Sequence, residues 1–267
     1  MTRFFLPQTP RLFAHRGDNV RYPENTLQAF RAAVERGLRY LEMDVWMSSD
    51  HMLVVHHDRT TLRTCGVETE IPETEFTRIR ELDPGWGFVD SRGERPFAGK
   101  GIRIPALEEV LEAFPQTLLT LEIKQDTQQL PRKLLSILRE AQALDRVLIA
   151  SHQDGVVRQV REMEPEIPTS FGYEEIREFI LGAQEGALSG YNPPASALQI
   201  PPRHEERELV TPEVVRTAKQ LGVEIHVWTV NEEEYARSLL QMGVEGIMSD
   251  DAEMLGRLME KRSSGAA

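Results

Sequence analysis

The sequence contains very little cysteine: Cys65 is the single one among 267 residues, so no disulfide bond can form within the chain. It also lacks any apolar run near the roughly 20 residues that a membrane-spanning helix needs. The N-terminal segment has only Phe4, Phe5 and Leu6 before a proline, too few for the apolar region of a secretory signal. These absences predict a globular chain with no transmembrane segment, for which the cytoplasm is the default location.

Positive charge is scarce as well, because 31 lysines and arginines stand against 43 aspartates and glutamates, giving a net charge of -12. An acidic chain disfavours nonspecific nucleic-acid binding, which depends on neutralising phosphates. An anionic small molecule would need local positive charge from a metal ion or a few well-placed cations. Dinucleotide binding is also disfavoured, since no glycine-rich fingerprint follows any predicted strand.

Short β-rich runs alternate with amphipathic helical stretches along the chain. Eight strands are predicted, at residues 11–15, 38–45, 117–123, 146–151, 168–172, 196–200, 224–230 and 245–249. Apolar residues at helical spacing recur between these runs, and several helical stretches end in a glycine, as at Gly37, Gly222 and Gly243. This alternation favours an α/β fold, a (β/α)8 barrel of the triosephosphate-isomerase type, over an open doubly wound sheet.

We predict one catalytic barrel domain over residues 1–267, with an insertion at about 58–103 after the second strand and its hairpin. The segment is far longer than a crossover helix and is rich in proline and glycine. Its aromatic residues Trp86, Phe88 and Phe97 indicate that it packs on something rather than forming a loose loop. The tail from Ser263 to Ala267 is expected to be disordered.

Three carboxylates are predicted to converge at one end of the barrel. Glu42 and Asp44 are two residues apart on the second strand, so their side chains share one face. A pair of this kind is equally typical of a solvated surface strand, but the third strand adds Glu122, with Lys124 two residues later on the same face. The C-terminal strand ends of a barrel are where substrates bind. Oxygen ligands gathered there favour one hard divalent cation, Mg²⁺ or Ca²⁺.

The residues that follow Asp44 are predicted to turn back as a hairpin, because the next apolar run comes too soon for a parallel crossover. If Ser49 and Asp50 form the turn, Glu42 lies across from His57. The hairpin would then bring this histidine back to the carboxylates.

Two histidines, His15 at the end of the first strand and His57 in the hairpin, are therefore predicted beside the carboxylates. They supply a general acid and a general base at neutral pH, and metal ligation is their second choice because a hard cation prefers oxygen. His56 is predicted to face the opposite side and to be partly exposed, and His226 to pack low in the barrel. The remaining histidines are predicted to be surface residues: His51, His152 and His204.

Two cations and one aromatic residue complete the predicted site. Arg16 can hold a phosphate through two hydrogen bonds, whereas Lys124 acts as a point charge. Trp228 near the end of the seventh strand is predicted to form an aromatic wall at the barrel opening, with ordinary core packing as the alternative.

Taken together, these residues occur in motifs that span nearly the whole chain. The motifs are AHRG (14–17) with PENT (23–26), LEMDV (41–45), VVHHD (54–58), LDPGWGF (82–88) with IPALEEVL (104–111), LEIK (121–124), VWTVN (227–231) and GIMSD (246–250). In this order they closely resemble the glycerophosphodiester phosphodiesterase family. The resemblance implies a triosephosphate-isomerase-type barrel that hydrolyses a small-molecule glycerophosphodiester to sn-glycerol 3-phosphate and an alcohol.

The resemblance also implies the role of each site residue. The implied roles are acid-base catalysis for His15 and His57, phosphate contacts for Arg16 and Lys124, and metal ligation for Glu42, Asp44 and Glu122. It leaves open which histidine is the acid, and whether water or the neighbouring glycerol hydroxyl attacks the phosphorus. A monomer and a homodimer are both compatible with the sequence.

Three alternatives stay open at this point. The first is a lysophospholipase D, in which Trp86, Phe88 and Phe97 of the insertion would form an acyl groove. The second is a catalytically silent barrel that binds phosphodiesters, although both histidines and all three carboxylates are present. The third is a structural barrel with solvated strand ends, which would leave the motifs without explanation.

Overall fold

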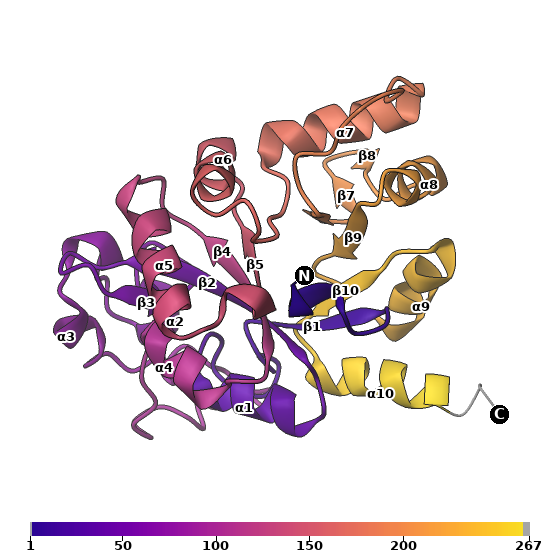
Figure 1. Ribbon diagram of the computed structural model, residues 1–267. Coiled ribbons are helices and arrows are strands. Elements are labelled where there is room, and N and C mark those ends of the chain that lie inside the picture. Colours follow the sequence, from indigo (N-terminus) through magenta and orange to yellow (C-terminus); the bar gives the residue numbers. More distant parts are fainter. Residues whose placement is uncertain (1, 264–267) are drawn as a thin grey trace.

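The structure, a computed structural model, describes residues 2–263, so the expected disordered tail lies outside the described residues apart from Ser263 (Figure 1). Within this range, the parallel strands lie in the order β5-β4-β2-β1-β10-β9-β6. These strands are β1 (Arg11–His15), β2 (Tyr40–Met47), β4 (Leu118–Ile123), β5 (Val147–Ala150), β6 (Ala197–Ile200), β9 (Glu224–Val227) and β10 (Gly246–Ser249). Seven of the eight predicted strands are therefore confirmed, with small shifts at their ends.

The eighth predicted strand, residues 168–172, closes the barrel without forming a regular strand. Thr169 bridges to Ile149 of β5, and Ser170 bridges to Ala197 of β6, with one parallel bridge on each side. Pro168 opens the segment and has no backbone N–H to donate, so it contributes only its carbonyl, which accepts from Ile149. The result is a parallel sheet of seven strands nearly closed into the predicted barrel.

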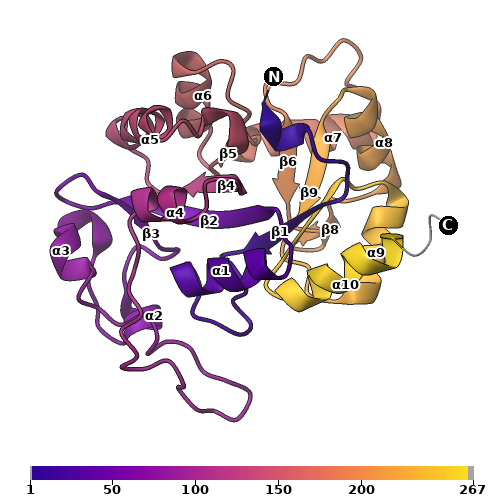
Figure 2. The same cartoon turned by 60° about the horizontal axis from the view of Figure 1, so that its bottom comes forward.

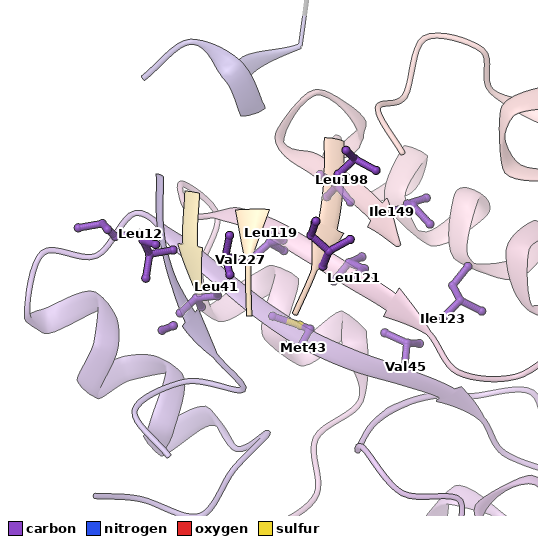
Figure 3. Close-up of a cluster of buried hydrophobic side chains, with 14 of the residues drawn as sticks. Leu12, Leu41, Met43, Val45, Leu119, Leu121, Ile123, Ile149, Leu198 and Val227 are labelled. Carbon is purple, nitrogen blue, oxygen red and sulfur yellow. The ribbon is translucent and has the colours of Figure 1, made fainter. Parts of the chain in front are cut away.

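Helices flank the sheet on its outer side (Figure 1). They are α1 (Leu27–Glu35), α4 (Leu107–Ala113), α5 (Gln129–Glu140), α6 (Asp154–Met163), α7 (Tyr173–Glu185), α8 (Pro212–Gln220), α9 (Glu233–Met242) and α10 (Ala252–Ser263). Alternate strand residues such as Leu41, Met43 and Leu121 belong to a buried layer shared with these helices (Figure 3). Burial of this continuous apolar layer is the main stabilising contribution to the barrel.

The other strand residues point into the barrel, and at its N-terminal end they form a closed floor. Phe13 and Tyr40 pack together there, with ring centroids 4.9 Å apart. Phe4, from the short 3-10 helix η1 (Arg3–Phe5), covers them, and the Tyr40 hydroxyl donates to its carbonyl at 2.7 Å. The floor leaves the C-terminal end of the barrel as the place for a site.

The predicted hairpin forms, but its register differs by one residue from the prediction. β3 (Leu53–Val55) pairs with β2 so that Val45 lies opposite Val55, and this places Asp44 rather than Glu42 next to the returning strand. The turn holds one extra residue, because His51 adopts a left-handed backbone conformation with φ 63°. The predicted pairing of Glu42 with His57 is therefore wrong.

The segment after β3 lies to one side of the barrel (Figure 2). It contains α2 (Leu62–Cys65), the 3-10 helix η2 (Ile71–Glu73) and α3 (Phe76–Ile79). Their apolar side chains pack on Trp46 and Val54 of the hairpin in a small cluster of their own. The other short elements are the 3-10 helix η3 (Leu144–Arg146) and the hairpin strands β7 (Arg203–His204) and β8 (Arg207–Glu208).

Candidate active site

The parallel register gathers the predicted site residues at the C-terminal end of the barrel. His15 pairs with Glu42 across β1 and β2, and Asp44 pairs with Glu122 across β2 and β4. All the predicted residues except Asp44 line one cavity of about 80 Å³: His15, Arg16, Glu42, His57, Glu122, Lys124 and Trp228. Asp44 lies just beneath them, with 1% of its surface exposed.

The turn after β1 has a backbone that few residues tolerate. Arg16 has φ 56° and Gly17 has φ 87°, both in the left-handed region. A side chain at Gly17 would come within 2.6 Å of the Ala29 backbone, so only glycine fits against α1. The amide of Arg16 donates to a side-chain oxygen of Glu42 at 3.1 Å. The tight turn thus aims both the backbone and the side chain of Arg16 at the carboxylates.

The PENT stretch serves both the helix and the site. Thr26 caps α1 by accepting a hydrogen bond from the Ala29 amide. Asn25, with φ 54°, donates from its side chain to Asp44 at 2.9 Å. Non-glycine residues held at positive φ concentrate at functional sites, and here one orients a buried carboxylate.

Glu42, Asp44 and Glu122 form a group that could hold a metal ion, because each offers an oxygen within 4.8 Å of the other two. Burial and the neighbouring Asp44 raise the pKa of Glu42 to about 8, so its charged form needs a further positive partner. Asp44 Oδ1 is buried and has no hydrogen-bond partner among the described residues, although Lys124 Nζ lies 3.3 Å from it. A hard cation on oxygen ligands would satisfy both groups.

Two basic side chains stand beside these carboxylates. Arg16 Nε lies 3.2 Å from Asp44, and Lys124 Nζ lies 3.1 Å from Glu122. Burial alone would raise the pKa of Asp44, but Lys124 and Arg16 outweigh it and keep that carboxyl ionised. The two cations therefore supply the local positive charge that an acidic protein needs for an anionic ligand.

His15 is held by a carboxylate that the sequence analysis did not select. Its Nδ1 lies 2.7 Å from Asp250, which also accepts from Asn19 at 2.6 Å and Asn231 at 2.8 Å. Burial disfavours the charged imidazole, yet Asp250 and Glu42 outweigh it and raise the pKa of His15. With Nδ1 engaged, Nε2 faces the cavity, 3.9 Å from Glu42.

His57 has the same kind of support. Its Nδ1 lies 2.6 Å from Asp58, and the indole of Trp46 donates to its backbone carbonyl at 3.0 Å. His56, predicted to be partly exposed, is instead buried, with its ring nitrogens 2.8 Å from the Asp58 carbonyl and the Thr64 hydroxyl. The prediction for His56 was wrong because the insertion folds over that side of the hairpin. His226 is fully buried in the barrel, as predicted.

Sequence reasoning missed Asp250 and the role of His152. Asp250 directly follows β10, so the strand-end rule that selected Glu122 would also have found it. His152 is exposed as predicted, but its Nε2 lies 3.5 Å from Glu122 and its ring packs on Trp228. Its place in the site depends on the loop after β5, which the sequence pattern does not fix.

A second, larger cavity of about 590 Å³ adjoins the first and shares four lining residues with it: His152, Ile176, Gln199 and Trp228. Its other lining residues come mainly from α7 and the β7–β8 hairpin. They include the apolar residues Ile180, Leu181, Ile200, Pro201 and Leu209. Trp228 thus stands between the polar cavity and an apolar one.

The aromatic residues of the insertion lie elsewhere. Trp86 packs under the Arg95 guanidinium, 4.0 Å from the ring centroid. Phe97 packs between Phe88 and Tyr22. The insertion aromatics of the lysophospholipase D alternative therefore do not line the large apolar cavity.

Polar residues gathered at the C-terminal strand ends are typical of barrel enzymes. Carboxylates that could hold a metal ion, next to basic side chains, are typical of a site that binds a phosphate ester. The chain belongs to the glycerophosphoryl diester phosphodiesterase family, which its residues 15–254 match. It is 34% identical over 255 residues to the glycerophosphodiester phosphodiesterase of Caldanaerobacter subterraneus subsp. tengcongensis, covering 94% of this chain and 98% of that relative. It is accordingly a phosphoric diester hydrolase of the glycerophosphodiester phosphodiesterase type.

Solved structures share the barrel fold of this chain. A putative glycerophosphoryl diester phosphodiesterase from Silicibacter pomeroyi has a TM-score of 0.78 at 26% identity, with 96% of this chain and 95% of that chain covered. A phosphodiesterase from Oleispira antarctica, in complex with the product sn-glycerol-3-phosphate, has a TM-score of 0.73 at 22% identity, with 94% and 98% covered. The part of the chain that the structure describes has no helix long and apolar enough to cross a membrane.

Proposed function

We propose that the chain is a single catalytic domain that hydrolyses glycerophosphodiesters to sn-glycerol 3-phosphate and an alcohol, with a divalent cation and two histidines. The observation that carries the proposal is the placement of two histidine–carboxylate pairs around one cavity. Both pairs engage Nδ1, at 2.7 Å in His15 and 2.6 Å in His57, which leaves each Nε2 for the substrate. The product bound to the Oleispira antarctica phosphodiesterase supports the choice of glycerol 3-phosphate.

The residues have distinct roles in this proposal. Glu42, Asp44 and Glu122 hold Mg²⁺ or Ca²⁺, which when bound offsets the negative charge of the phosphodiester. Arg16 and Lys124 bind the phosphoryl oxygens and stabilise the charge that develops on them.

Each of the two histidines transfers one proton in the proposed reaction. An attacking oxygen, from water or from the neighbouring glycerol hydroxyl, forms a bond to phosphorus and gives its proton to one histidine. The bond from phosphorus to the alcohol oxygen breaks, and the other histidine protonates that oxygen. Attack by the glycerol hydroxyl forms a cyclic phosphate first; water then attacks its phosphorus, the bond to the glycerol 2-oxygen breaks, and the two histidines exchange their roles as acid and base. A 2-deoxy analogue therefore distinguishes the routes. Its hydrolysis at an unchanged rate would exclude the cyclic route.

The test is release of glycerol 3-phosphate from glycerophosphocholine. We expect His15→Ala and His57→Ala each to lower kcat by about 10²- to 10⁴-fold, and a chelator to abolish release until Mg²⁺ or Ca²⁺ is restored. His51→Asn is the matched control, because asparagine tolerates the left-handed backbone of that turn histidine. Binding without release would establish a silent binding barrel, and release unaffected by chelator would remove the metal from the proposal.

A second candidate is hydrolysis of lysophospholipids, the lysophospholipase D reaction, and the cavity of about 590 Å³ favours it. Its volume is in the range of small-molecule sites. Its continuity with the polar cavity at Trp228 would leave room for an acyl chain on the glycerol phosphate part of the substrate, while choline remains the leaving alcohol. We expect Leu181→Gln and Leu209→Gln to raise KM for lysophosphatidylcholine while leaving glycerophosphocholine hydrolysis unchanged.

The test compares the kinetic constants of one variant for the two substrates, so it does not depend on protein yield. Leu62→Gln, on the exposed side of the insertion, is the control that should alter neither value. Faster hydrolysis of glycerophosphocholine than of any lysophospholipid, with no change in the Leu variants, would rule the second candidate out.

A further inference from the structure

One arginine of the insertion, Arg63 in α2, contacts two carboxylates, and each of these carboxylates also contacts a residue of the candidate site. Its Nε donates to Asp58 at 2.7 Å. Its two terminal nitrogens donate to the two carboxylate oxygens of Glu24, at 2.6 Å and 2.8 Å. A guanidinium can make such fork-like contacts with two carboxylates, whereas an ammonium group cannot.

The first contact leads to His57. Asp58 accepts from Arg63 through one oxygen, while its other oxygen lies 2.6 Å from His57 Nδ1. Despite partial burial, these partners lower the pKa of Asp58 to about 2, so the carboxylate stays ionised and its two oxygens stay divided between them. The ring orientation of His57 is therefore tied to Arg63 through one carboxylate.

The second contact leads to Arg16. Glu24 Oε1 accepts from Arg63 and also from Arg16, whose Nη1 lies 3.1 Å away. The Nε of Arg16 in turn lies 3.2 Å from Asp44. Arg16 is thus held between Glu24 and Asp44, one of the proposed metal ligands. Arg63 holds Glu24 at the outer end of this row of ion pairs.

Packing holds Arg63 in this position. Gly66 caps the C-terminus of α2 with φ 70°, and a Cβ on Gly66 would come within 2.7 Å of the Trp86 ring. The amide of Gly87 donates to the Thr64 carbonyl at 2.7 Å. The later part of the insertion therefore packs against α2, and this packing holds the helix that carries Arg63 in place.

We propose that Arg63 is a positioning residue, through which the insertion fixes His57 and Arg16 relative to each other in the active site. The inference rests on the proposed function of those two residues. An exposed ion pair alone would contribute little to stability, whereas loss of a residue that orients site groups typically lowers activity 10- to 100-fold. The two contacts also predict separable effects, since one leads to a proton-transfer group and the other to a phosphate-binding group.

The experiment measures kcat and KM for glycerophosphocholine in Arg63→Met, Asp58→Asn and Glu24→Gln. We expect Asp58→Asn to lower mainly kcat, Glu24→Gln to raise mainly KM, and Arg63→Met to do both, with kcat/KM reduced about 10- to 100-fold. In a double variant that combines Arg63→Met with either of the other changes, the loss of kcat/KM, expressed as a free energy, should be smaller than the sum of the two single-variant losses. In Arg63→Lys, either kcat or KM should return toward the wild-type value, but not both, because an ammonium group cannot keep both carboxylate contacts.

The matched control is Arg59→Met in the same insertion. Arg59 has a similar side-chain exposure, 52% against 49%, and pairs with Glu70 and Glu73 away from the site. It should keep both constants within about twofold of wild type, since it touches no site group. Equal kinetics in Arg63→Met and Arg59→Met would overturn the proposal, and Arg63→Lys provides the same comparison if Arg63→Met fails to fold.

A second readout needs no turnover: the NMR signal of the His57 Nδ1 proton in histidine-labelled protein, assigned with His57→Gln. We expect Arg63→Met to shift or broaden this signal and Arg59→Met to leave it unchanged. If wild type releases no product but the signal still responds, the proposed function fails and the positioning of His57 stands. A signal unchanged in Arg63→Met overturns the positioning itself.

Discussion

The two histidines are each oriented from the side away from the cavity. Asp250 and Asp58 engage their Nδ1 atoms, and Asp250 is in turn fixed by Asn19 and Asn231. A carboxylate on one ring nitrogen sets the tautomer and the direction of the other. In the proposed reaction, the orientation of the two histidines therefore depends on these supporting residues as well as on the histidines themselves.

For this reason we expect Asp250→Asn to lower kcat/KM about 10- to 100-fold. The asparagine can keep the size of the side chain but removes the charge that stabilises the His15 imidazolium. Steady-state kinetics and a thermal melt of the same sample check the prediction. Asp126→Asn, an exposed carboxylate after β4, serves as control. Full activity in Asp250→Asn would show that His15 needs no carboxylate partner.

Most of the candidate site could be predicted from the sequence at the residue scale, because strand alternation decides which side chains share a face. Glu42 and Glu122 needed only that rule and the parallel order of the strands. His57 needed the hairpin register, which a single left-handed residue, His51, displaced by one position. Backbone conformations of this kind depend on tertiary packing, so no local pattern specifies them.

At the scale of elements, the strand positions were predictable and the connections were not. Short β-rich runs marked the strand positions, residues 168–172 included, but they did not reveal that this segment closes the barrel through single bridges only. The large apolar cavity combines α7 with the β7–β8 hairpin, whose contact is set by the fold rather than by either segment. The insertion aromatics, which the lysophospholipase D alternative assigned to an acyl groove, do not line this cavity.

The opposite end of the barrel carries a partly buried ion pair that links strands β1 and β9. Arg11 donates twice to Glu224, at 2.6 Å and 2.7 Å, and His226 Nε2 lies 3.0 Å from the same carboxylate. Burial would raise the pKa of Glu224, but these partners outweigh it and lower the pKa to about 2, against an ordinary value of 4.5. The carboxylate therefore stabilises the fold above pH 4.5, and this contribution is lost as the pH falls toward 2.

We expect Glu224→Gln to lower the free energy of unfolding by about 3 kcal/mol at pH 7, because Arg11 is left buried without its charge partner. The difference from wild type should shrink as the pH falls from 4.5 toward 2, where the wild-type carboxylate also becomes neutral. Urea titrations across that range measure it, with the exposed Glu185→Gln as control. A difference that stays constant with pH would contradict the assignment.

At the scale of the whole molecule, the barrel brings three carboxylates together at a cost in stability. Glu42, with a pKa raised to about 8, is buried beside Asp44, so folding either sets two negative charges against each other or keeps Glu42 protonated at neutral pH, and both carry a cost. A bound cation would convert this repulsion into attraction. Because such an ion binds the folded chain and not the unfolded one, it shifts the unfolding equilibrium of the entire domain.

We therefore expect Mg²⁺ or Ca²⁺ at about 100 times its dissociation constant to stabilise the protein by about 2.7 kcal/mol, a rise in Tm of about 5–10 °C for a domain of this size. Glu42→Gln should change Tm in opposite directions without and with the metal ion. Without metal it relieves the repulsion with Asp44 and raises Tm, whereas with metal it removes a ligand and the rise on addition is lost. Calorimetry with and without chelator separates the two effects. A Glu42→Gln variant that is less stable than wild type without metal would mean that the carboxylates are held together by Arg16 and Lys124 alone, and that the site is complete without a cation.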